Sequence, residues 1–140
     1  MQSSQNSVIT SSKATRRSRV VVYWISTALF CVEMAFTAYY ELLPQGAQAF
    51  IRLGFPASSF RVELSLAKLI GVLALLLPYI HSRLKEWAYA GFAINLVSAL
   101  IAHTFIHDRP AAFIPSSLTS VLWALSYFSW YPVQARRKTG

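Results

Sequence analysis

The sequence predicts an all-α fold, an integral membrane four-helix bundle with both termini cytoplasmic, and three observations lead to it. Hydrophobic residues make up 55% of the 140 residues, and charged residues make up 13%, about half the share usual in soluble proteins. Four apolar runs are each about 20 residues long, the length that a helix needs to cross the hydrocarbon. The basic residues gather at the ends of these runs. Because spans must satisfy their own backbone hydrogen bonds, a bundle of helices is expected.

The chain divides into two tails and one membrane domain. Residues 1–19 are polar and end in a basic cluster, so we expect a flexible cytoplasmic tail without enough apolar surface to fold. Residues 133–140 form a second basic cytoplasmic tail. The domain between them, 20–132, contains the four predicted spans, at about 20–40, 60–80, 87–106 and 112–131.

Proline residues mark the ends of the predicted spans. Pro44, Pro110 and Pro132 each follow an apolar run and cannot continue a regular helix. The longest loop, 41–59, contains the segment AQAFIRLGF, which predicts a short interfacial helix with its apolar side facing lipid.

The distribution of positive charge predicts the orientation. The net charge is +8, and nine Lys and Arg residues lie on the side of the two termini against three on the other side. Positive residues are retained on the cytoplasmic side of a membrane, so both termini are predicted to be cytoplasmic and the protein to lie in the cell inner membrane. The same residues favour contact with anionic lipids at the cytoplasmic face. No basic face for nucleic acid is predicted, because the basic residues cluster at the ends of the spans.

A lysine in the middle of the second span is the main candidate functional residue. Lys68 lies roughly 12 Å below the outer surface, and Glu33 on the first span lies roughly 10 Å below it, at 1.5 Å per helical residue. Each of these opposite charges is unfavourable on its own inside the membrane, and the two lie at the same depth, so we predict that they form an ion pair. Glu63 and His103 lie in the same outer half, so the four residues form a predicted buried polar cluster. The cluster is a candidate site, and the alternative is a pair that only sets the register of the helices.

Further polar residues are predicted to line the bundle interior. Asn95, Ser98 and Tyr127 are expected to form hydrogen bonds between helices. His103 and His107 are four residues apart with Asp108 beside them, a spacing that can hold a metal on one helix face. No metal site is predicted, because a second pair of ligands is missing from the sequence.

Several short motifs resemble those of the DoxX-like family of small bacterial membrane proteins. They are YWIST (23–27), LGFP (53–56), LAKLIG (66–71), ALLLP (74–78), LKEWAYAGF (84–92) and HTFIHD (103–108). The resemblance covers about 23–127 and implies a four-helix integral membrane protein. It places Lys68, Glu86, Trp87, His103 and Asp108 at family motif positions, with His107 where the family would have glycine. The family takes its name from DoxX and DoxD proteins linked to an archaeal thiosulfate:quinone oxidoreductase.

Three functions are compatible with these residues. The first is a redox-associated membrane subunit holding a quinone, with Lys68, His103 and Tyr127 at its head group; it would need a redox partner protein in the membrane or in solution. The second is a small-molecule or proton pathway. The third is a non-enzymatic scaffold or assembly factor. The sequence contains no self-contained catalytic or redox centre, so no resident cofactor is predicted, and a homo-oligomer is compatible with every alternative.

Overall fold

The computed structural model describes residues 1–54, 58–107 and 109–137, and in these ranges it is all-helical, with no strand. The all-α class is therefore confirmed. The elements in chain order are α1 (Gln2–Leu42), α2 (Pro44–Arg52), α3 (Ser58–Leu76), α4 (Ser82–Phe105), the short 3-10 helix η1 (Pro110–Ala112) and α5 (Phe113–Arg137).

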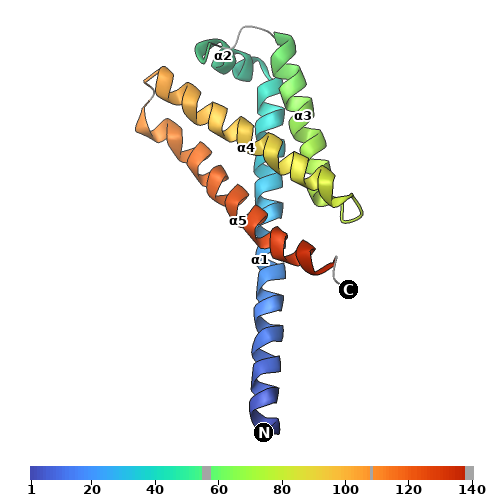
Figure 1. Ribbon diagram of the computed structural model, residues 1–140. Helices are drawn as coiled ribbons and strands as arrows, with labels where there is room; N and C mark the ends of the chain where they lie inside the picture. The colour runs from blue at the N-terminus through green and yellow to red at the C-terminus, as the bar shows by residue number, and fades with distance from the viewer. Residues whose placement is uncertain (55–57, 108, 138–140) are drawn as a thin grey trace.

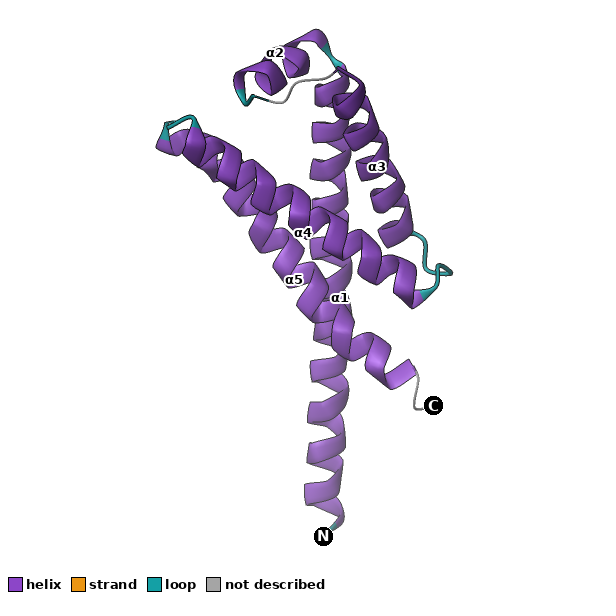
Figure 2. Ribbon diagram, turned by 45° about the horizontal axis from the view of Figure 1, so that its top comes forward, coloured by secondary structure: helices purple, strands orange, loops and turns teal. Residues whose placement is uncertain are grey.

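The long helix α1 organises the molecule. It packs against α3 on one side and against α5 on the other, and α4 packs against both α3 and α5. Figure 1 shows α1 and α3 side by side, with α4 and α5 running obliquely across α1, and Figure 2 shows the same arrangement from a second direction. Helices α1 and α3 are antiparallel, so the C-terminal end of α1, which is the outer end in the predicted orientation, lies beside the beginning of α3 (Figure 1).

The N-terminal part of α1 extends beyond the packed helices (Figure 1). The sequence predicted a flexible tail over 1–19, whereas the structure continues α1 back to Gln2, with the described side chains of this stretch exposed. The hydroxyls of Thr10 and Thr15 donate to the carbonyls of Asn6 and Ser11, one turn earlier. A helix that is already nucleated gains one backbone hydrogen bond for each added residue, which accounts for the extension.

Three helices in the described ranges are long and apolar enough to cross a membrane: Val8–Leu42, Ser82–Phe105 and Pro110–Tyr131. The second predicted span, 60–80, is not among them. Its helix α3 contains Arg61, Glu63 and Lys68 within 19 residues and ends at Leu76, before Pro78. Three charged residues in so short a helix are more than a typical span carries, and this sets α3 apart from the other three long helices.

Two other helix ends differ from the predicted span ends. Helix α4 begins at Ser82, five residues before the predicted span, and α5 continues past Pro132 to Arg137. The apolar run marks where a helix lies in hydrocarbon, and a helix can continue into water on either side. For this reason hydropathy predicts the span and not the end of the helix.

Close packing between α3 and α4 depends on a glycine. A Cβ atom at Gly71 would lie 2.8 Å from Cζ of Phe92, so the ring occupies the space that a side chain would need. The Phe92 ring in turn meets Phe30 of α1 edge to face, at 5.0 Å between centroids. Gly71 therefore lets α4 reach the core that α1 and α3 share.

Candidate functional site

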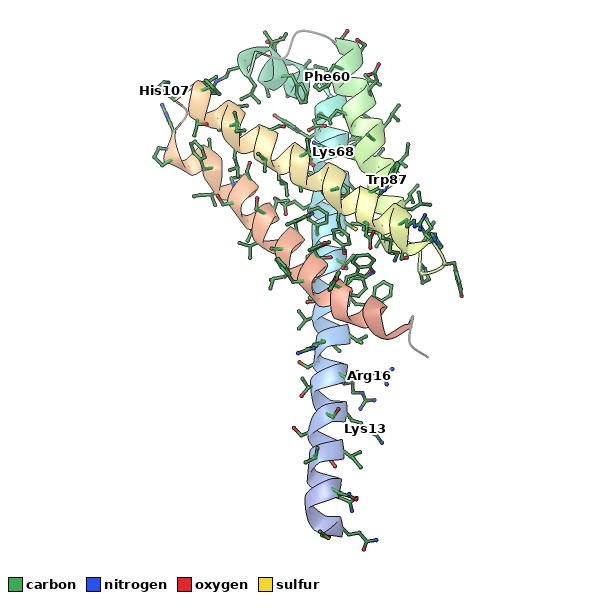
Figure 3. The ribbon with its side chains drawn as sticks, viewed as in Figure 1. Lys13, Arg16, Phe60, Lys68, Trp87 and His107 are labelled. Carbon is green, nitrogen blue, oxygen red and sulfur yellow. The ribbon has the colours of Figure 1, made fainter. Side chains whose placement is uncertain are left out.

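Lys68 is buried between α1 and α3, and its partner is Glu41. The side chain is 7% exposed, and Nζ forms an ion pair and hydrogen bond with Oε1 of Glu41, near the outer end of α1. Figure 3 shows Lys68 on the side of α3 that faces α1. The predicted pairing of Lys68 with Glu33 is wrong.

The length of α1 explains the change of partner. The first span was predicted to end at Tyr40, which left Glu41 in a loop, but α1 continues to Leu42 and keeps Glu41 on the helix. Because α1 and α3 are antiparallel, Lys68 on α3 lies beside the C-terminal end of α1, and its Nζ reaches the carboxylate of Glu41.

Two more side chains of α3 hold the outer end of α1. Ser65, fully buried, donates its hydroxyl to Oε2 of Glu41 at 3.0 Å. Arg61 donates to the backbone carbonyl of Glu41 and to that of Leu43, the latter at 3.2 Å. A helix C-terminus carries unpaired carbonyls and partial negative charge, so the guanidinium caps α1. We name Glu41, Arg61, Ser65 and Lys68 the outer ion-pair cluster.

The short helix α2 packs against this cluster through Gly46. A Cβ atom there would lie 2.7 Å from the Cα of Glu41, closer than real side chains approach backbone. Glycine is the residue that lets α2 fold back directly after Leu43, which is extended and followed by Pro44 at the first helical position. The turn thus places α2 over the outer end of α1.

Glu33 lies elsewhere, at the contact between α1 and α5. Its Oε1 is hydrogen-bonded to Oγ1 of Thr119, a residue that is 3% exposed. The same hydroxyl oxygen is 2.8 Å from the carbonyl oxygen of Pro115. Among the described residues, the partner of this half-buried carboxyl is therefore a hydroxyl and not a cation.

The remaining members of the predicted cluster do not join these groups. Glu63 is exposed on α3. His103 is half-buried on α4, with its ring 5.7 Å from that of Phe113 at the start of α5. The four predicted residues therefore occupy separate places: the outer ion-pair cluster, the α1–α5 contact, the α4–α5 contact and the surface.

The residues predicted to line the interior of the bundle do not all lie there. Asn95 is half-buried on α4, but Ser98 is exposed and does not line the interior. The face of α4 that enters the core carries Tyr89, Phe92 and Leu96, and this spacing turns Ser98 outwards. Tyr127 is half-buried and stacks on Trp123, with 5.5 Å between ring centroids and 3° between planes.

The predicted metal-binding spacing does not lie on one helix. Helix α4 ends at Phe105, and His107 follows it with a φ of 50°, exposed in the connection to α5 (Figure 3). This left-handed conformation favours glycine, the residue that the family resemblance implies at this position. Asp108 lies outside the described residues. Among the residues that are described, no three His, Cys, Asp or Glu side chains are grouped to hold a metal.

A buried hydroxyl network in the inner half was missed by the sequence interpretation. The hydroxyl of Ser126 meets those of Thr27 and Tyr89, at 2.6 Å each, and joins α1, α4 and α5. Trp123 donates its indole N–H to the carbonyl of Tyr89 at 3.0 Å. The spacing of Thr119 and Ser126, seven residues apart on α5, was the available clue, because two turns of helix return to nearly the same face.

Lys85 is a second buried lysine, at the opposite end of the bundle. It was predicted to lie in a cytoplasmic loop, but it belongs to the first turn of α4 and is 7% exposed. Its Nζ donates to the carbonyl of Leu75 at 3.2 Å, in the last turn of α3. A cation at that position satisfies a free carbonyl and opposes the negative end of the helix dipole.

Comparison with known proteins gives one result. A family model described as the DoxX-like family matches residues 25–125, which extend from the apolar part of α1 into α5. Neither the search of curated proteins nor the search of solved structures finds a match.

Proposed function

The chain belongs to the DoxX-like family, and on this premise we propose that it is a four-span inner-membrane protein in which Glu33 is the proton-binding residue of a small-molecule pathway. One observation carries the proposal. The lysine that could neutralise Glu33 is bound to Glu41, and the carboxyl of Glu33 has a hydroxyl as its partner.

The cost of a carboxylate within a membrane supports this role. Ionisable residues inside spans are expensive, and they are retained where they pair with one another or serve ion and proton movement. Glu41 belongs to the first kind, because Lys68 neutralises it. Glu33 has no such compensation among the described residues, and a carboxyl that takes up a proton avoids the cost of the charge.

The hydroxyl of Thr119 can form a hydrogen bond with Glu33 in either protonation state of the carboxyl. A threonine hydroxyl has one hydrogen, yet Oγ1 of Thr119 contacts two oxygens, from Pro115 and from Glu33. When Glu33 is ionised, Thr119 donates to it. When Glu33 carries a proton, Glu33 donates to Thr119, which then donates to Pro115. Rotation of one hydroxyl therefore serves both states without movement of a helix.

Carbodiimide labelling tests the role of Glu33, because hydrophobic carbodiimides react with protonated carboxyls in apolar surroundings. Purified protein in lipid vesicles is treated with the carbodiimide, and the modified residue is identified by peptide mass spectrometry. We expect a single adduct at Glu33. Thr119→Val should change the extent of labelling, because it removes the hydroxyl that is hydrogen-bonded to this carboxyl.

Two variants serve as controls for the labelling experiment. Glu33→Gln should abolish the labelling, and Glu63→Gln, at the exposed glutamate of α3, should leave it unchanged. Failure to label Glu33, or equal labelling of Glu33 and the exposed Glu63, would overturn the proposal.

The redox alternative makes a different prediction. It rests on the family resemblance and on a quinone head group held by Lys68, His103 and Tyr127, but Lys68 is engaged by Glu41 and Tyr127 is stacked on Trp123. Native mass spectrometry of wild type beside Lys68→Met distinguishes the two. A quinone-sized mass retained by wild type and lost from the variant would favour the redox subunit. Bare protein in both cases, without carbodiimide labelling, would leave the scaffold interpretation.

A further inference from the structure

A groove lies between α1 and α5, and neither Glu33 nor Glu41 is among the residues that line it. It has a volume of about 460 Å³, within the range of small-ligand sites, and it is open on one side. Six residues line it: Arg19, Val121, Ala124, Leu125, Phe128 and Ser129.

The lining combines one cation with an apolar wall. Arg19 is the last basic residue of α1 before the apolar run that begins at Val20. Val121, Leu125 and Phe128 are all exposed, on the side of α5 that does not face the core. A ligand that satisfies both parts is an amphiphile with an anionic head beside Arg19 and a hydrocarbon chain along α5.

We propose that this groove binds one anionic phospholipid from the cytoplasmic leaflet. The guanidinium of Arg19 is suited to pair with phosphate oxygens in a bidentate manner, and Ser129 adds a hydroxyl to the lining of the same groove. The choice of leaflet rests on the orientation that the distribution of positive charge predicts, with both termini cytoplasmic. The site itself is separate from Glu33, so either proposal can fail alone.

Charge selects a lipid as the occupant over a second copy of the chain. The protein carries a net charge of +8, and Lys13, Arg16 and Arg17 lie on the same helix within two turns of Arg19. A second copy would bring further positive charge to a groove that already contains a cation. An anionic lipid lowers this repulsion while its chain covers the exposed apolar side chains of α5.

Native mass spectrometry with added lipid tests the site. Wild-type protein in mild detergent is titrated with phosphatidylglycerol and, separately, with phosphatidylcholine of the same chain length. We expect one phosphatidylglycerol to be retained per chain, in preference to phosphatidylcholine. Arg19→Gln should weaken the retention about five- to tenfold, as expected for loss of one basic contact to an anionic lipid.

Matched variants separate a site from diffuse attraction. Arg16→Gln removes the same charge from the same helix but lies outside the groove, so it should retain the lipid as wild type does. Val121→Trp fills the groove from an exposed position and should displace the lipid without disturbing the core. Equal weakening by Arg16→Gln and Arg19→Gln, equal retention of the two lipids, or full binding by Val121→Trp would overturn the proposal. Melting temperatures of all variants should match that of wild type, which confirms folding.

Discussion

At the scale of single residues, two glutamates on one helix have opposite surroundings. Glu41 contacts an ammonium group and a serine hydroxyl, so its charge is compensated in the folded state. Glu33, eight residues earlier, contacts the hydroxyl of Thr119. We infer from this difference that Glu41 stabilises the fold, while Glu33 is the carboxyl that the proposed function uses.

Replacing Lys68 should destabilise the protein through Glu41. In Lys68→Met a carboxylate that is 13% exposed loses its cation, and we expect a loss of about 3 kcal/mol in the free energy of unfolding. The double variant Lys68→Met, Glu41→Leu should recover most of this loss, because no unpaired charge remains. Thermal unfolding in detergent measures both.

A second double-mutant cycle provides the control. Lys68 and Glu33 share no contact, so the effects of Lys68→Met and Glu33→Leu should add within about 0.5 kcal/mol. Strong coupling in this cycle, or no coupling between Lys68 and Glu41, would contradict the observed pairing.

At the scale of elements, α1 connects the two halves of the fold. Its outer end is fixed to α3 and α2 by the outer ion-pair cluster and by Gly46, and its middle contacts α5 through Glu33 and Thr27. Helix α4 reaches this assembly by packing Phe92 over Gly71. The positions of α3 and α4 relative to α1 therefore depend on small residues as well as on apolar area.

Gly71→Ala should loosen the contact between α3 and α4. The new methyl group would overlap the Phe92 ring, which is itself 3% exposed and cannot move freely, so we expect a loss of about 1–3 kcal/mol. Gly91→Ala is the matched control, because a Cβ atom at Gly91 meets no heavy atom within 4 Å. That variant should be neutral or more stable by about 0.5 kcal/mol, since alanine favours helix. Melting temperatures that rank the two variants in the reverse order would exclude this packing role.

At the scale of the whole molecule, the topology depends on α3. Three helices can cross a membrane by length and composition, and we propose that α3 is the fourth span. It lies antiparallel beside α1 (Figure 1), its lysine is neutralised by Glu41, and Arg61 lies near its outer end. Pairing within the bundle removes the penalty that excludes α3 on composition alone.

Single-cysteine labelling tests this topology. Cys31 is the only cysteine, so a Cys31→Ala background allows one cysteine to be placed at Gln5, Ser59 or His81, all exposed. With a maleimide that cannot cross membranes, we expect Ser59→Cys to react in intact cells and the other two only after permeabilisation. Reaction of Ser59→Cys and His81→Cys from the same side would show that α3 does not span.

The composition and the apolar runs were sufficient to predict helices, while the site required knowledge of helix ends. Glu33 and Lys68 were placed at matching depth by counting residues from predicted span ends. That count left Glu41 outside the first span, and it therefore missed the carboxylate nearer the lysine. Ser98 was assigned to the interior because its hydroxyl could form a hydrogen bond between helices, but the face of α4 that enters the core carries Tyr89, Phe92 and Leu96.

The sequence by itself determined that this protein is helical and rich in membrane-crossing segments, because hydrocarbon admits few backbone conformations and hydropathy is a property of each segment alone. Its motifs also determined the DoxX-like membership that the family comparison bears out. Only the tertiary structure decided which polar groups meet: Lys68 with Glu41, Glu33 with Thr119, and Tyr89 with Ser126. These pairings depend on the length of each helix and on its rotation about its own axis. Packing between the helices sets both, so the sequence of a single segment does not determine them.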